Sequence, residues 1–143
     1  MNNKNNVTST RMAGFFIGLI ALLGSTHLIA NDTGQLSNKF IQRAVLTTEV
    51  TDREPVDNLN ATAIDENTAK VYFFTEVTDL SGQSITHRWS LDGKVQAEVS
   101  LNIGSNRWRT YSSKNLVPIL KGTWLVEAVD EQNRVIASTT FTY

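Results

Sequence analysis

The sequence of 143 residues contains no cysteine. This absence excludes a disulfide framework, a thiol nucleophile, cysteine-ligated zinc and iron–sulfur clusters. It also excludes the acylated cysteine that anchors bacterial lipoproteins. Any attachment to a membrane would therefore have to come from the N-terminal segment itself.

Histidine is almost as scarce, with His27 and His87 the two present. There is no H-x-H or H-x-x-x-H pair for zinc, and no G-x-S-x-G elbow for a serine nucleophile. We therefore expect no catalytic residue, no metal and no cofactor. His87 would share a strand face with Trp89, which favours a partly buried, hydrogen-bonded histidine. A hydrolase acting on cell-envelope polymers stays as an alternative hypothesis.

Hydrophobic residues make up 41% of the chain and charged residues 19%, which is typical of a globular protein. Without residues 1–30 the chain keeps 11 Lys and Arg against 14 Asp and Glu. This negative balance is opposite to the basic surface that nucleic-acid binding needs, so nucleic acid is not an expected partner.

The N-terminus has the order of a secretory signal peptide. A polar stretch carrying Lys4 and Arg11 precedes the apolar run 12–24 and a short segment that ends at Ala30. Residues 12–30 carry no full charge and approach the length of a membrane span, so an uncleaved anchor is the alternative. Both interpretations predict a periplasmic domain, free or anchored at the inner membrane, because the positive charges stay inside.

From Phe40 onward, segments rich in β-branched and aromatic residues alternate with turn residues, which predicts strands. We expect seven of them, at 41–51, 70–79, 84–91, 94–103, 107–113, 123–129 and 134–143. Their spacing predicts one all-β domain, an antiparallel β-sandwich of the immunoglobulin or fibronectin type over residues 41–143, with residues 31–40 as linker.

Several local features refine this expectation. Pro55, in the turn-forming run 52–58, should end any strand ladder, and residues 60–68 form either a long loop or one helical turn. The strand that begins at Lys70 is apolar on both faces near its start, which favours a central position or a covered outer face. Asp92-Gly93 is a strong hairpin signal. After it, one face should hold Val95, Ala97, Val99, Leu101 and Ile103.

The order and spacing of several short runs resemble a known family. These runs include Arg43-Ala44, Asp52 to Asp57, Val71 to Glu76, Thr86 to Trp89, Arg107 to Lys114, Gly122 to Trp124 and Phe141 to Tyr143. Together they resemble the bacterial family known as domain of unknown function 2914, over about 41–143. The resemblance implies an envelope or membrane-associated location and no reaction.

Cations concentrate in the second half of the chain. Six lie from Arg88 to Lys121, against the acids Asp92 and Glu98. If the strands at 84–91 and 107–113 are close, one patch for an anionic ligand or glycan would form from Arg88, Arg107, Trp108, Arg109 and Lys114. The alternative is internal ion pairing, because eight acids lie between Glu49 and Asp79.

The aromatic and acidic residues allow other interpretations. Trp89 and Trp124 alternate with apolar residues and are expected in the core, whereas Trp108 suits either the core or a sugar-stacking surface. Asp52, Glu54 and Asp57 contain oxygen ligands for calcium but lack the spacing of a calcium loop.

The sequence therefore predicts a non-enzymatic module that binds an envelope protein or an anionic glycan. A structural subunit that docks through an exposed edge strand is a further alternative.

Overall fold

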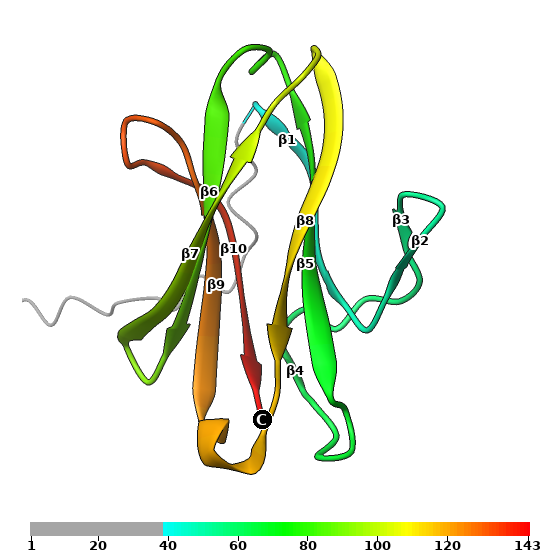
Figure 1. Cartoon of the computed structure of the whole chain (residues 1–143), viewed down its shortest axis with the longest axis vertical. Helices are drawn as coiled ribbons and strands as arrows, with labels where there is room; N and C mark the ends of the chain where they lie inside the picture. Colours follow the sequence, from blue (N-terminus) through cyan, green and yellow to red (C-terminus); the bar gives the residue numbers. More distant parts are fainter. Residues whose placement is uncertain (1–38) are drawn as a thin grey trace, which may run out of the picture. The chain divides into compact units, whose positions relative to one another are not determined.

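The computed structural model describes residues 39–143, and these residues form a β-sandwich (Figure 1). The long strands are β1 (Ile41–Thr47), β5 (Lys70–Thr78), β6 (Ser84–Leu91), β7 (Lys94–Asn102), β8 (Arg107–Asn115), β9 (Thr123–Val129) and β10 (Val135–Thr142). The short elements are β2 (Val50–Thr51), β3 (Glu54–Pro55), β4 (Thr62–Ala63) and the 3-10 helix η1 (Pro118–Leu120). The seven long strands correspond to the seven that the sequence predicts.

Two sheets face each other. One has the order β1-β5-β8 and the other the order β4-β10-β9-β6-β7, while β2 and β3 form a separate hairpin. The long strands pair antiparallel throughout, and the short β4 pairs parallel with β10. The all-β, immunoglobulin-like sandwich that the sequence predicts is confirmed.

The inner faces of the two sheets form the core. Trp89, Trp124, Phe73 and Phe141 are fully buried or nearly so, and the Trp124 and Phe141 rings stack with centroids 5.8 Å apart. Both predicted core tryptophans, Trp89 and Trp124, are therefore confirmed. Offset and edge contacts between aromatic rings add to the free energy that burial of their apolar area contributes.

Strand β5 occupies the centre of its sheet and is covered on both faces. Val71, Phe73 and Val77 point into the core, whereas Phe74 faces outward and is nonetheless fully buried. The Arg43 guanidinium lies 5.1 Å from the Phe74 ring centroid. Burial on both faces agrees with the apolar run that the sequence shows there.

The first strand is shorter than expected. It ends at Thr47 rather than Thr51, and Val50-Thr51 pairs instead with Glu54-Pro55 in the β2–β3 hairpin. Asp52 and Arg53 both have positive φ, which is the conformation that a type I′ hairpin turn requires. The ladder of this hairpin ends at Pro55, as the sequence predicts, but the turn-forming run also contains the two-residue strand β3, which the sequence did not indicate.

In strand β7, Val95 does not share a face with Ala97, Val99 and Leu101, although the sequence predicted that it would. Trp89 pairs with Ala97, but the next residue, Ser90, pairs with Val95, so Gln96 is an extra residue. This bulge moves Val95 to the outer face with Ser90, and Val95 is 56% exposed. Ala97, Val99 and Leu101 keep the expected alternation and are partly buried at the edge of the sheet.

The segment at 60–68 contains the short β4 and no helical turn. Just before β4, the Asn60 side chain bonds to the free edge of β1, accepting from Leu46 N at 2.7 Å and donating to the Ala44 carbonyl at 3.0 Å. Across the described part of the chain, no helix has the length and hydropathy that a membrane span needs. The predicted signal or anchor at 1–30 lies outside the described residues.

Candidate functional site: an arginine cluster on one outer sheet face

Three charged residues lie in one row across the outer face of the β1-β5-β8 sheet. The strand register pairs Arg43 of β1 with Glu76 of β5, and Glu76 with Arg109 of β8. Directly paired residues on neighbouring strands share a face and lie within contact distance. Strand pairing alone therefore places one carboxylate between two guanidinium groups.

Glu76 is the buried centre of the row, with a side chain only 1% exposed. The carboxylate accepts a hydrogen bond from Arg43 Nε at 2.6 Å and another from Arg107 Nε, and Arg109 Nε lies 3.7 Å away. Burial by itself raises the pKa of Glu76, but the hydrogen bonds from Arg107 and Arg43 and their charges outweigh it and lower the pKa. Glu76 is thus held as an anion.

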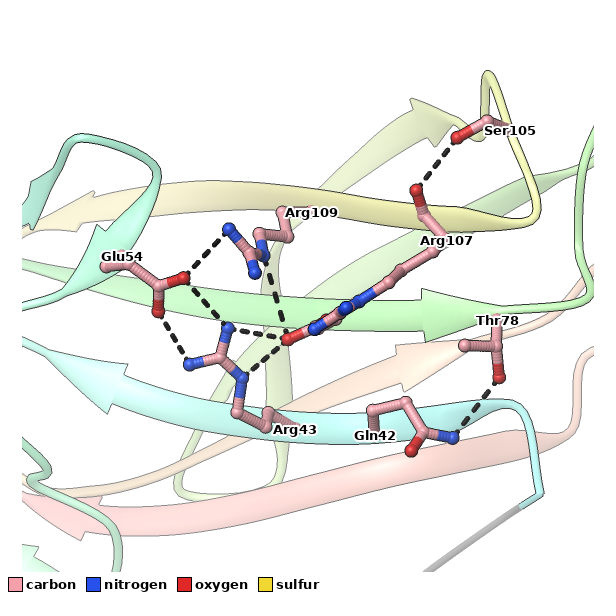
Figure 2. A network of polar contacts seen from close by, with 8 residues as sticks. Gln42, Arg43, Glu54, Thr78, Ser105, Arg107 and Arg109 are labelled. Atoms are coloured by element: carbon pink, nitrogen blue, oxygen red, sulfur yellow. Dashed lines mark hydrogen bonds and ion pairs between the residues drawn. The ribbon is translucent and has the colours of Figure 1, made fainter.

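The β2–β3 hairpin contributes a second carboxylate to the same face. Glu54 accepts from Arg43 Nη1 at 2.6 Å and lies 2.8 Å from Arg109 Nη1. Figure 2 shows Arg43 and Arg109 reaching Glu54 from two different strands. The hydrogen bond from Arg43 is the main cause of the lowered pKa of Glu54, and the same bond raises the pKa of Arg43.

The cluster has more cations than carboxylates. Arg107 uses its Nε for Glu76, yet its side chain is 68% exposed, so its terminal nitrogens face water. A hollow of about 160 Å³ is lined by Arg53, Arg107 and Arg109. A second, wider depression of about 730 Å³ opens beside Glu76 and Arg107, toward Gln42 and Asn106. Guanidinium donors therefore line open space on this face.

The structure does not gather the five residues that the sequence grouped into one patch. Arg107 and Arg109 lie together on the outer face of β8. Lys114 pairs with the buried Val71, so it lies on the inner side of β8, where Nζ is 5.6 Å from the Trp124 ring centroid. Of the predicted patch, therefore, only Arg107 and Arg109 lie side by side, whereas Lys114 and Arg88 lie elsewhere.

Arg88 is the second distant cation, because β6 belongs to the other sheet. It donates from Nε to Glu98 at 2.7 Å and from Nη2 to Asn133 at 2.8 Å, and Nη1 lies 3.7 Å from Glu127. The hydrogen bond to Glu98 is the main cause of the raised pKa of Arg88. For Arg88, internal ion pairing is what the structure shows.

The sequence allowed Trp108 either in the core or on a sugar-stacking surface, and the structure places it partly in the core. It pairs with the inward-facing Val77 and packs partly buried against the core. A Cβ on Gly104 would lie 2.9 Å from the Trp108 ring, so part of the ring is covered, and Arg53 lies 6.0 Å from its centroid. Its ring is therefore not a free stacking surface.

His87 is more buried than expected, at 0% exposure. Its Nε2 is 3.1 Å from Thr75 Oγ1 and its Nδ1 2.9 Å from Ser112 Oγ, while Trp89 Nε1 donates to the same Ser112 oxygen at 3.0 Å. Burial lowers the pKa of His87 to about 3, so the ring is neutral. This network joins the two sheets inside the core.

The three acids of the run 52–57 do not converge. Glu54 contacts arginines, and Asp57 accepts hydrogen bonds from the Thr47 and Thr48 hydroxyls at 2.7 and 2.5 Å. Among residues 39–143, no group of three or more histidine and acidic side chains is placed to hold a metal ion. The calcium interpretation thus has no geometric support in this part of the chain.

Sequence reasoning missed Arg43, Arg53, Glu54 and Glu76 as members of the site. One signal was available, because Glu76 is an acidic residue in a strand that begins with apolar side chains on both faces and is buried along most of its length. A carboxylate in such a position needs cationic partners. Which cations meet it depends on strand order, which the sequence does not show.

Comparison with protein families supports the resemblance noted from the sequence. Residues 82–143 match the model of a family described as "Protein of unknown function (DUF2914)". The resemblance is confirmed over these residues. The match covers β6 to β10 in full, and it therefore includes Arg107 and Arg109 but not Arg43, Glu54 or Glu76. A comparison with curated proteins gave no match.

Solved structures offer distant likenesses. The chain is similar to the CARDB domain of the PF1109 protein from Pyrococcus furiosus, solved in complex with di-metal ions, with a TM-score of 0.42 and 13% identity over 78% of this chain and 96% of that one. It is also similar to an engineered protein, with a TM-score of 0.39 and 12% identity over 70% of this chain and 20% of that one. Likeness at this level carries nothing about ligands.

Proposed function

We propose that this domain is a non-enzymatic binding module that takes an anionic group of a cell-envelope component on the arginine face of the β1-β5-β8 sheet. The observation that carries the proposal is the hollow lined by Arg53, Arg107 and Arg109. Three guanidinium groups around one small open space offer a fork geometry that matches a carboxylate, phosphate or sulfate.

Two carboxylates hold the arginine side chains in place, and the arginines would then bind the anion through charged hydrogen bonds. Glu76 fixes Arg107 through Nε, and Glu54 fixes Arg109 through Nη1. A guanidinium held by one carboxylate loses less side-chain entropy when it binds a second. The bound anion would therefore meet donors that are already oriented.

The envelope location is part of the proposal and rests on the N-terminal pattern of the sequence. An exported domain with a charged recognition face would meet the anionic polymers and proteins of the envelope. The hydrolase alternative requires an exposed His87, and this side chain is fully buried. Docking through an edge strand has no particular observation in its favour, since the bulge at Gln96 interrupts the exposed edge of β7.

Titration calorimetry with two carboxylated polymers, polygalacturonate and polyglutamate, tests the proposal. We expect at least one polymer to bind, and the affinity to fall at higher salt because exposed charges are screened. Replacing Arg107 with Ala should weaken binding about tenfold or more, as expected for losing a charged hydrogen bond.

Arg88→Ala is the matched control, because it removes one arginine from the other sheet. Its binding should equal that of the unchanged protein. Equal losses from Arg107→Ala and Arg88→Ala would show that net charge alone attracts the polymer, and the proposal would then be wrong. So would the absence of binding to either polymer.

A further inference from the structure

The outer face of β8 continues beyond the arginines with an aromatic side chain. Arg107, Arg109, Tyr111 and Ser113 follow one another at every second position of β8, which places them all on the outer face. Tyr111 is 48% exposed. Its partner across the strands is Phe74, which is buried beneath this face. The strand thus forms a straight line of guanidinium, aromatic and hydroxyl groups.

The Tyr111 ring is held in place. Tyr72 meets it edge-on, with centroids 5.8 Å apart and an interplanar angle of 70°. The Lys70 ammonium lies 5.9 Å from the Tyr72 ring. A ring fixed by an edge contact keeps its exposed surface available and loses little entropy when a ligand packs on it.

We propose that the ligand of the arginine face is a linear acidic glycan, with a carboxylated sugar at Arg107 and Arg109 and the next sugar packed on Tyr111. This inference rests on the proposed function and names its ligand class. Positions two apart on a strand are separated by about 7 Å, so a sugar at the arginines and a neighbouring sugar at Tyr111 can belong to one extended chain that runs along β8. Sugar rings present both hydroxyls and apolar C–H surface, so guanidinium and aromatic groups in line match them.

The charge of the cluster favours an acidic glycan over a neutral one. The cluster contains two carboxylates, both already in contact with arginines, and four arginines: Arg43, Arg53, Arg107 and Arg109. An acidic peptide could bind to the same arginines, but its binding would not require contact with the exposed Tyr111 ring. An anionic lipid surface would need a broad flat patch of charge rather than a line along one strand.

The test compares oligogalacturonate, polyglutamate, a neutral dextran and vesicles containing anionic phospholipid. We expect oligogalacturonate to bind more tightly than polyglutamate, and dextran and vesicles to bind weakly or not at all. Tyr111→Ala should weaken oligogalacturonate binding about threefold to tenfold, whereas Tyr111→Phe should leave it nearly unchanged because the ring is kept. Ile119→Ala, which removes an 87% exposed apolar side chain elsewhere, is the control.

The outcomes separate the two proposals. If polyglutamate binds as well as oligogalacturonate and Tyr111→Ala changes neither, the glycan inference is overturned while the anion site stands. Tight binding to the vesicles but not to the sugar polymer would also overturn it. Loss of binding in Arg107→Ala without any effect of Tyr111→Ala would point to an anion site with no sugar platform.

Discussion

The outer faces of the two sheets carry mirrored charge triplets. On the β1-β5-β8 sheet, the register places Glu76 between Arg43 and Arg109. On the other sheet, it places Arg88 between Glu98 and Glu127. Each triplet has its central charge neutralised by two neighbours, but the outer charges have opposite signs.

The difference shows how strand pairing decides which charges are available. A carboxylate enclosed by guanidinium groups accepts bonds from a few of their nitrogens, and the remaining N–H groups can face water. Arg88, enclosed by glutamates, donates hydrogen bonds to Glu98 and Asn133, and its side chain is 24% exposed. The first arrangement leaves more cationic surface exposed, since the side chain of Arg107 is 68% exposed and that of Arg88 is 24% exposed.

The largest expected effect comes from neutralising the centre of the first triplet. Glu76→Gln would remove the carboxylate that Arg43 and Arg107 share, and we expect the free energy of unfolding to fall by about 2–3 kcal/mol, as for the loss of charged hydrogen bonds. Arg88→Gln, the corresponding change in the second triplet, should cost about 1 kcal/mol or less, because its partners are partly exposed. Urea unfolding measures both. Equal losses would mean that the two triplets are equivalent.

A pH effect should come from His87, which has no charged partner. Burial lowers its folded-state pKa to about 3, well below the usual 6.5. The unfolded chain therefore binds a proton below pH 6.5 while the folded domain does not, and stability falls as the pH falls. We expect a loss of about 2 kcal/mol between pH 7 and pH 5.

His87→Gln provides the control for that loss. The variant should be less stable at pH 7, because it loses the buried hydrogen bonds of His87, but it should lack the change between pH 7 and pH 5. Carboxylates such as Glu76 have a lowered pKa, so they contribute stability that is lost only below about pH 4.5. An unchanged pH dependence in His87→Gln would assign the effect to another group.

A smaller effect is expected at the rim of the first triplet. Arg43→Met keeps apolar cover over Phe74 but removes the bonds to Glu76 and Glu54. We expect a loss of about 1–2 kcal/mol, since Glu76 keeps Arg107 as a partner. Thermal unfolding followed by tryptophan fluorescence would measure it. If Arg43→Met lost as much stability as Glu76→Gln, the idea that several arginines together neutralise Glu76 would be wrong.

The smallest effect on stability should come from Arg107→Ala. Its side chain is 68% exposed and Glu76 keeps Arg43, so we expect a change of about 1 kcal/mol or less. Urea unfolding of Arg107→Ala alongside Arg43→Met would show the contrast. A large loss would identify Arg107 as a structural residue and remove it from the binding face.

The sequence predicted the strands but not their neighbours. Period-two alternation located all seven long strands, and Asp92-Gly93 formed the expected hairpin with both residues at positive φ. Arg43, Glu76 and Arg109 come from three distant segments, and only the strand order brings them together. The bulge at Gln96 and the β2–β3 hairpin had no clear signal, because single extra residues and two-residue strands leave the local pattern almost unchanged.

The central claim is that the donors free to bind lie around the Glu76 triplet and not around the Arg88 triplet. Nuclear magnetic resonance spectra of the arginine Nε–Hε groups during titration with oligogalacturonate test it directly. We expect the signals of Arg53, Arg107 and Arg109 to move together with those of the Tyr111 ring, while the Arg88 signal stays unchanged. Movement of the Arg88 signal with no change at Arg107 and Arg109 would contradict it.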